Sequence, residues 1–187
     1  MACTLKDIKR SAQSCTESYS GIGTSVYVAF YEDLVAQYDY SVKEDVAGFD
    51  PGSFIFKDGK GFYQLDIKKK SGKVTAESNG QGKGFTNVLT FVINQSMDDM
   101  ALISRAMNNA DTLWAASDGK GGYYMIYDRN FAPEVAISAD TGDTPDSDNG
   151  FTVTVTGTPM RYPLARWIPE SGGIDTDFTQ KAPETGE

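Results

Sequence analysis

The sequence predicts a mainly β protein, an antiparallel β-sandwich or barrel with one flanking α-helix. Three observations indicate this class. Residues 151–157 (FTVTVTG) alternate between apolar side chains and threonines, as a half-buried strand does. Further runs rich in valine and tyrosine are separated by glycine and aspartate turns. Only one segment has a convincing helical pattern, and one helix cannot supply the crossovers that a parallel sheet requires.

The segment 84–109 joins a strand to that helix. Its first half alternates, with Phe85, Leu89 and Ile93 on one face. Because its second face is also partly apolar, we expect a strand inside a sheet with protein on both sides. Ser96 is a suitable N-cap, and an apolar stripe at helical spacing follows it to the end of the segment.

Short runs with strand character occupy much of the remaining chain. The remaining strands are expected at residues 24–34, 53–56, 62–70, 73–78, 112–116, 123–128 and 134–139. We interpret 62–70 and 73–78 as a β-hairpin around a Ser-Gly turn. We interpret 112–116 and 123–128 as a second hairpin around a glycine-rich turn, and residues 32–50 as acidic and turn-rich.

The predicted organisation is an N-terminal arm at 1–20, a β-sandwich body at 21–167 and an acidic flexible tail at 168–187. The arm is mostly polar, with Leu5 and Ile8 as its apolar anchors. Two interpretations of the arm stay open, a frayed terminus and a segment that docks on a neighbouring subunit. The tail has one lysine against five acids, a net charge of −4, so we expect it to be disordered or docked on a partner.

Size and charge narrow the classes of function. The chain has 187 residues, of which 40% are hydrophobic, enough for one buried core and short for two domains. Its 17 basic and 26 acidic residues give a net charge of −9, which argues against sequence-independent binding to nucleic-acid phosphates. No apolar run approaches the ~20 residues of a membrane span. The polar N-terminal sequence lacks a signal-peptide core, so we expect the chain to be made and kept in a cytoplasm.

Catalytic residues are scarce in this sequence. It has no histidine, which removes the commonest general base and the commonest zinc ligand. A disulfide between Cys3 and Cys15 stays open, although free thiols fit the expected compartment better. Nucleophilic catalysis by a Ser–Lys pair stays formally open. Glycosidase chemistry would need a pair of carboxylates, and no such pair lies in a recognisable sequence frame. We reject the glycine-rich run 80–84 as a phosphate-binding loop, because it precedes a strand and lacks the Lys-Ser/Thr ending of a Walker motif. We therefore expect no enzyme, no cofactor and no metal.

The tip of the first predicted hairpin is a candidate interaction site. Seven lysines stand against three acids between positions 57 and 83, a local reversal of charge in an acidic chain. The tip carries Lys68, Lys69, Lys70 and Lys73. One interpretation is a solvated hairpin whose lysines prevent edge pairing. The other is a basic projection that meets an acidic surface on another copy.

A second candidate interaction site is the acidic loop 140–150. It carries Asp143, Asp146 and Asp148 and ends in Asn-Gly, which superficially resembles a calcium loop. The glycine and glutamate that an EF-hand places at its sixth and twelfth positions are missing, so we do not predict a calcium site. We interpret this loop as a subunit-contact segment that complements the lysines.

The order of these elements resembles the tail tube proteins of long-tailed bacteriophages, and more distantly the tubes of contractile injection systems. The resemblance extends over residues 20–165 and is most specific in three stretches. They are QLDIKKKSGKVTAES, FTNVLTFVINQSMDDMALISRAMNN and NGFTVTVTG. The resemblance implies two packed antiparallel sheets with a flanking helix. It also implies rings of six copies whose inner strands join into one β-barrel, stacked head to tail in the virion tail.

The same resemblance implies the partners. They are other copies of the chain, other tail proteins, and genomic DNA that passes through the lumen without specific binding; no membrane is implied. An acidic lumen would repel phosphate, so DNA would slide without sticking. The basic hairpin and the acidic loop would set the ring-to-ring register, since a head-to-tail interface needs two complementary surfaces. Synthesis would take place in the cytoplasm of the host bacterium.

Two other classes remain as alternatives. One is another phage ring or adaptor component, a tail terminator or head–tail connector, which would stop at a single ring instead of polymerising. The other is a generic β-domain that acts as a binding module. An enzyme ranks third, because it would need a pocket with perturbed titratable groups.

Overall fold

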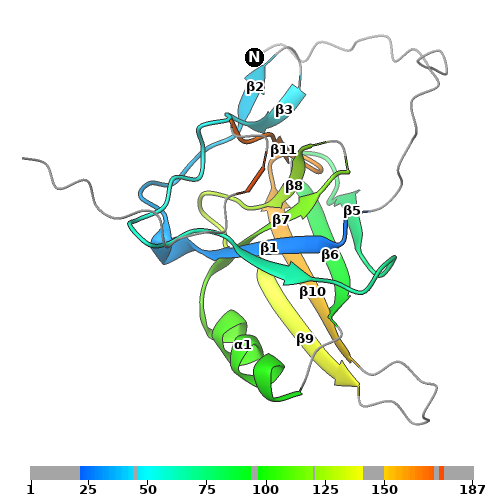
Figure 1. Cartoon of the computed structure of the whole chain (residues 1–187). Helices are drawn as coiled ribbons and strands as arrows, with labels where there is room; N and C mark the ends of the chain where they lie inside the picture. The colour runs from blue at the N-terminus through cyan, green and yellow to red at the C-terminus, as the bar shows by residue number, and fades with distance from the viewer. Residues whose placement is uncertain are drawn as a thin grey trace, which may run out of the picture.

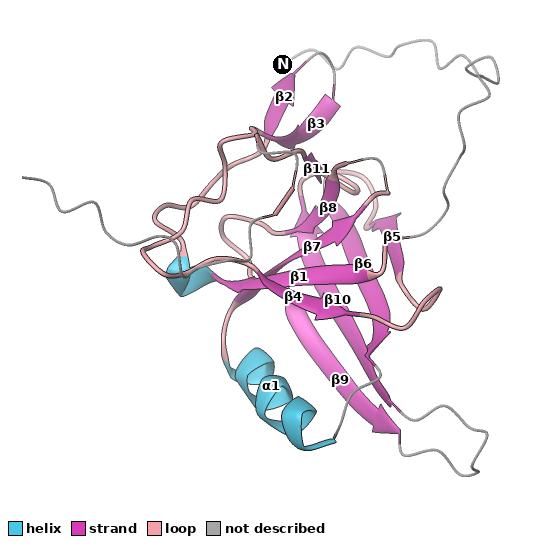
Figure 2. Ribbon diagram, viewed as in Figure 1, coloured by secondary structure: helices cyan, strands magenta, loops and turns pink. Residues whose placement is uncertain are grey.

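Two β-sheets and one α-helix make up the described part of the protein in this computed structural model (Figures 1 and 2). The described residues are 22–43, 46–93, 97–119, 121–140, 150–170 and 173–174. Strands predominate and most neighbouring strands are antiparallel, so the predicted mainly β class is confirmed.

The larger sheet has seven strands. Their spatial order is β2 (Ser41–Lys43), β3 (Val46–Phe49), β11 (Arg166–Trp167), β8 (Tyr123–Ile126), β7 (Thr112–Ser117), β1 (Ser25–Phe30) and β4 (Tyr63–Asp66). Only β3 and β11 run parallel, and β2 and β4 form the two edges. The hairpin predicted from 112–116 and 123–128 is present as β7 and β8.

The smaller sheet has four strands and is antiparallel throughout. Their order is β5 (Lys73–Ser78), β6 (Phe85–Ile93), β10 (Gly150–Met160) and β9 (Glu134–Asp140). The alternation predicted at 151–157 lies in β10, whose register shifts between Gly157 and Met160. β6 lies inside this sheet, as the sequence predicts.

The predicted hairpin of 62–70 and 73–78 is wrong, because its two strands belong to different sheets. β4 pairs with β1, whereas β5 pairs with β6. The chain changes sheets at a single step. The amide of Ile67 donates to the Thr24 carbonyl, and the next amide, of Lys68, donates to the Val92 carbonyl at 2.8 Å. Ile67 is buried where the chain leaves one sheet for the other, and an exposed turn at Lys69 and Lys70 leads from there into β5.

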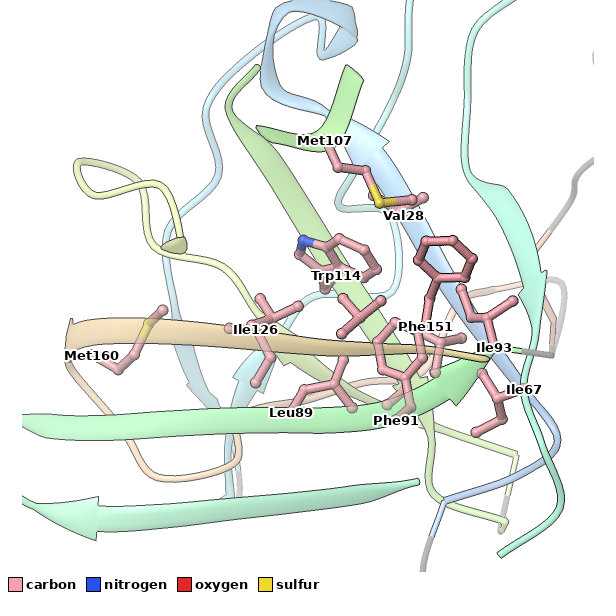
Figure 3. Packing of buried hydrophobic residues seen from close by; sticks show 14 residues of the cluster. Val28, Ile67, Leu89, Phe91, Ile93, Met107, Trp114, Ile126, Phe151 and Met160 are labelled. Carbon is pink, nitrogen blue, oxygen red and sulfur yellow. The ribbon is translucent and has the colours of Figure 1, made fainter. Parts of the chain in front are cut away.

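The main hydrophobic core lies between the two sheets (Figure 3). Alternate residues of β6 and β10 face it, including Leu89, Phe91 and Val153, all fully buried. Trp114 of β7 lies opposite, with its ring centroid 5.8 Å from that of Phe91. Its indole N–H donates to the Thr112 hydroxyl at 3.0 Å, which satisfies a buried donor. Each such aliphatic side chain contributes about 1.5–3 kcal/mol on burial.

A second hydrophobic cluster covers the other face of the seven-stranded sheet. From β7, Leu113 and Ala115 point into it, whereas Trp114 and Ala116 point into the main core. Aromatic side chains from the chain between β1 and β4, and from the chain after β10, complete this cluster. β7 therefore contacts protein on both faces, which explains why TLWAAS shows little polar alternation.

The predicted helix is confirmed as α1 (Met97–Asn109). In Figure 1 it lies beside β9, and its buried Met107 joins the main core, where Val135 and Ile137 of β9 also pack. The helix thus closes one side of the sandwich. The predicted N-cap, Ser96, lies outside the described residues. A short 3-10 helix, η1 (Tyr31–Asp33), occupies the end of the predicted strand 24–34.

The region between β1 and β4 differs most from the prediction. Residues 53–56 do not form a strand and contribute only an isolated bridge between Leu34 and Phe56. Residues 41–49 contain β2 and β3, which the acidic, turn-rich composition of 32–50 concealed. β11 was also not predicted, because its two residues lie among prolines.

The packed body continues beyond the predicted boundary at residue 167. Pro169 is buried, and Ile174 packs against the second cluster with its amide donating to the Tyr123 hydroxyl at 3.3 Å. The first residues of the predicted tail therefore belong to the body. The predicted arm 1–20 and the rest of the tail lie outside the described residues.

Candidate assembly surface

The outer face of the four-stranded sheet carries a regular row of threonines. On β10, Thr152, Thr154 and Thr156 point away from the core, because Phe151, Val153 and Val155 point into it. Cross-strand pairing then defines rows across the sheet. One row runs Lys73, Thr90, Thr154 and Ala136, and another runs Thr75, Val88, Thr156 and Glu134.

This outer face is uncovered by the described residues that form the two cores. Val88 and Val92 of β6 belong to neither hydrophobic cluster. Among the described residues, the second face of β6 therefore lacks the protein contact that its sequence predicts. Its threonines form local hydrogen bonds instead, such as that between the Thr86 and Thr158 hydroxyls at 3.1 Å.

Few charged side chains stand on this face. Lys73, Glu77 and Glu134 are exposed there, which gives one positive against two negative charges among its described side chains. The acidic excess of the chain is thus not concentrated on the described part of this sheet. The face instead carries mainly threonines and other small side chains, and its net charge is close to zero.

Both edges of the same sheet lack a strand partner among the described residues. β5 has six residues and β9 has seven. The centres of both strands, VTA in β5 and VAISA in β9, contain no charged residue. The edges of the larger sheet are shorter, with three residues in β2 and four in β4. Short edges, charged edges and edges covered by a helix resist pairing with another chain. β5 has little of this protection in its centre, whereas α1 lies beside β9.

The four candidate lysines lie on and before the edge strand β5. Lys69, Lys70 and Lys73 are exposed, and Lys68 is half-buried. The segment is held against the end of β6, where the Val92 amide donates to the Ser71 hydroxyl at 3.1 Å. A Cβ added to Gly72 would overlap the side chain of the half-buried Ile22, so the connector packs tightly here. We call residues 68–73 the lysine connector.

The acidic candidates Asp143, Asp146 and Asp148 lie outside the described residues. The structure does place the two ends of their segment, since Asp140 pairs with Gly150 at the end of β9 and the start of β10. Asp140 lies on the β9 edge of the sheet, whereas the lysine connector leads into β5 at the opposite edge. They are nevertheless at the same end of the strands, which the sequence did not reveal.

Sequence reasoning missed a tyrosine network that fastens the second cluster. The Tyr31 hydroxyl donates to the Asp128 carbonyl at 2.8 Å, and the Tyr127 hydroxyl donates to the Tyr38 carbonyl at 3.1 Å. Tyr40 likewise donates to the Tyr127 carbonyl. Burial raises the pKa of the Tyr31, Tyr40 and Tyr127 hydroxyls. The abundance of tyrosine was visible in the sequence, but the partners are distant in the chain.

A buried polar residue in β6 was also missed. Asn87 lies on the core face and donates its amide to the Tyr162 carbonyl at 3.1 Å, holding the segment after β10. This contact is structural.

The described residues contain no group of three or more His, Cys, Asp or Glu residues that could hold a metal. Hydrogen bonds from Gln64 and Ser25 lower the pKa of the exposed Asp66 carboxyl, which keeps it ionised. A cavity of about 300 Å³ between β1, β4 and α1 is lined mainly by apolar side chains, with Tyr63 as its one titratable group. That cavity does not supply an acid–base pair.

Comparison with known proteins gives no relative. No protein-family model, no curated protein and no solved structure matches the chain. Among the described residues, no helix combines the length and the apolar character needed to cross a membrane.

Proposed function

We propose that the chain is a structural subunit of a phage tail tube, in which rings of copies stack into a tube that conducts DNA. The observation that carries the proposal is the four-stranded sheet. One face of this sheet is buried in the core, the other face is uncovered, and both long edge strands lack partners among the described residues. Such a sheet is suited to form one section of the wall of a larger barrel.

The strand order supports the joining of identical sheets. β5 and β9, the two edges, run in opposite directions, because three antiparallel pairings separate them. When copies are related by rotation about one axis, β9 of one copy therefore lies antiparallel to β5 of the next. The ladder would continue around a ring without a change of pattern, and closure would remove every free edge of this sheet.

The outer face suits the lumen of such a ring. Threonine hydroxyls hold water, and the described side chains on this face include one lysine. A surface that is neutral to acidic offers no dense array of cations to bind phosphates. DNA would then pass along the wall without being retained, as a conduit requires.

The first test is negative-stain electron microscopy of the purified chain over a concentration series. Long hollow tubes of uniform diameter would support the tube subunit. Closed single rings that never stack would replace it with the terminator or connector, which shares the need for edge pairing. Monomers at every concentration, with and without extracts that supply other tail components, would overturn ring formation and favour a β-domain binding module.

A further inference from the structure

We infer that an aromatic pocket beside β11 binds a lysine side chain from the lysine connector of a second copy. The aromatic pocket is a cavity of about 350 Å³ between residues 51–56, Phe62, Trp167 and the described residues that follow Trp167. The contact rests on the proposed function, in which copies of the chain assemble. It gives the lysines a different partner from the acidic surface that the sequence predicts.

Aromatic side chains form the wall of this pocket. Phe54 and Phe62 are buried and pack against the buried Trp167, with ring centroids 5.1 and 5.8 Å from that of the indole. Phe56 packs edge-to-face on Phe62 at 5.0 Å. The Trp167 indole N–H donates to the Pro51 carbonyl at 3.3 Å, which occupies its donor and holds the ring. Because the rings are held in place before a ligand arrives, binding costs little reorganisation.

The aromatic pocket favours a cation. Among the described residues that line it, Glu170 is the only charged one, and it is exposed. Its carboxylate lies next to Gly52, since a Cβ added there would be 3.5 Å from Glu170 Oε1. Aromatic faces carry partial negative charge and attract ammonium groups. An apolar stem that ends in an ammonium group therefore matches both the rings and the carboxylate.

The lysine connector offers this chemistry. Lys69 and Lys70 are exposed in the turn before β5. Ser71 fixes that turn, because its amide and its hydroxyl both donate to the Lys68 carbonyl, at 3.1 and 2.7 Å. A lysine side chain is an ammonium group on a flexible four-carbon stem. The turn therefore presents two such groups to a partner.

One copy cannot make this contact with itself. β4 begins directly after Phe62, in the pocket wall, and runs toward the lysine connector (Figure 2). The chain from Phe62 to Lys68 spans about 20 Å at the rise of an extended strand, which is much longer than a lysine side chain. The partner is therefore another copy. Two different surfaces of one chain then meet head to tail, and such an interface builds rings or stacked filaments.

The first experiment tests the pocket by NMR, in the full-length chain at a concentration where it is monomeric. The probe is n-butylammonium, which has the stem and the ammonium group of a lysine side chain. The chain has two tryptophans, so we expect a saturable shift of the Trp167 indole N–H while that of Trp114, in the main core, stays unchanged. Butyrate and n-butanol should bind at least about threefold more weakly, and Glu170→Gln should weaken butylammonium binding by a similar factor.

The second experiment tests the second copy by analytical ultracentrifugation and electron microscopy. Lys69→Gln with Lys70→Gln should raise the concentration for half-assembly about three- to tenfold, because the ammonium groups are lost while the stems remain. Glu170→Gln should act in the same direction. Combining all three substitutions should add little to either change alone, since both remove one shared contact.

A matched control separates this contact from a general effect of charge. Lys83 is exposed in the turn before β6 and lies outside the lysine connector, so Lys83→Gln should assemble as the wild type does. Circular dichroism and thermal unfolding should show that every variant remains folded. An equal loss of assembly in Lys83→Gln would overturn the specific contact.

The outcomes distinguish the pocket contact from the proposed function. Wild-type tubes with no shift of Trp167 by butylammonium would overturn the pocket contact alone. Wild-type tubes with unchanged assembly of the Lys69→Gln, Lys70→Gln variant would also overturn it alone. A wild-type chain that never assembles would overturn the proposed function, and the contact between copies with it.

Discussion

The two sheets differ in what lies against their second faces. The seven-stranded sheet has the main core on one face and the aromatic second cluster on the other. The four-stranded sheet shares the main core but leaves its other face, with its threonines, uncovered by the described residues. Each sheet has two edge strands among the described residues, so the sheets differ in their faces. Only the four-stranded sheet leaves one face outside both hydrophobic clusters.

The strand sequences already contain this difference. In β7, Leu113 and Ala115 face one cluster while Trp114 and Ala116 face the other, so the strand is apolar on both sides. In β10, apolar residues alternate with threonines. Three substitutions and one change of pH test this difference between the two sheets.

The largest effect is expected at Leu113, on the covered second face of the large sheet. Leu113 is fully buried in the second cluster. Leu113→Ala should lower the free energy of unfolding by about 2–5 kcal/mol, because it removes buried apolar atoms and leaves a cavity. Urea unfolding of the monomer measures this. A loss below about 1 kcal/mol would show that the second cluster is loosely packed and that the contrast fails.

A smaller effect is expected at Gly48 in β3, which pairs with β11 in the seven-stranded sheet. A Cβ at this position would overlap the backbone carbonyl oxygen of Arg166 in the paired strand β11. Gly48→Ala should lower the free energy of unfolding by about 1–3 kcal/mol, because a backbone atom cannot move aside without separating the strands. Gly59→Ala serves for comparison, since an added Cβ there has open space and only its positive φ opposes the change. Equal melting temperatures of Gly48→Ala and the wild type would contradict this close approach.

Alkaline pH should destabilise the second hydrophobic cluster through its tyrosines. Burial raises the pKa of Tyr31, Tyr40 and Tyr127 above the ordinary value of 10.0. Above pH 10 the unfolded chain releases these protons while the folded chain retains them, so the stabilisation present below pH 10 is lost as the pH rises. Urea unfolding at pH 8 and pH 11 measures the loss, and Tyr40→Phe should reduce its slope. A slope that Tyr40→Phe leaves unchanged would exclude the Tyr40 hydroxyl from this effect.

The smallest effect on the monomer is expected at Thr154, in the middle of the uncovered face. Thr154→Ala should change the free energy of unfolding by no more than about 0.5 kcal/mol, because the side chain packs in neither cluster. The measurement is urea unfolding at a concentration where the protein is monomeric. A loss of several kcal/mol would mean that this face is covered in the monomer, contrary to the contrast drawn above.

Period-two patterns predicted the four-stranded sheet and its neighbours well. β6, β10 and α1 lie where alternation and helical spacing place them, because each element buries one side against the main core. These features depend on residues close together in the sequence, so the sequence contains their pattern.

Features set by distant contacts were not predicted. The step between sheets at Ile67 and Lys68 depends on hydrogen bonds to Thr24 and Val92, so a Ser-Gly turn in the sequence suggested a hairpin instead. β2, β3 and β11 pair with strands remote in the chain and have short, weak patterns of their own. The shared level of Lys73 and Ala136 likewise depends on a register across four strands.

Hydrogen–deuterium exchange of the monomer and of the assembly would show which sheet edges join, because it compares the edges of both sheets in one experiment. If the four-stranded sheets join, amides of β5 and β9 should become protected on assembly, while those of β2 and β4 should keep their monomer rates. Protection gained at β2 and β4, with β5 and β9 unchanged, would contradict the account and place the joining surface on the seven-stranded sheet.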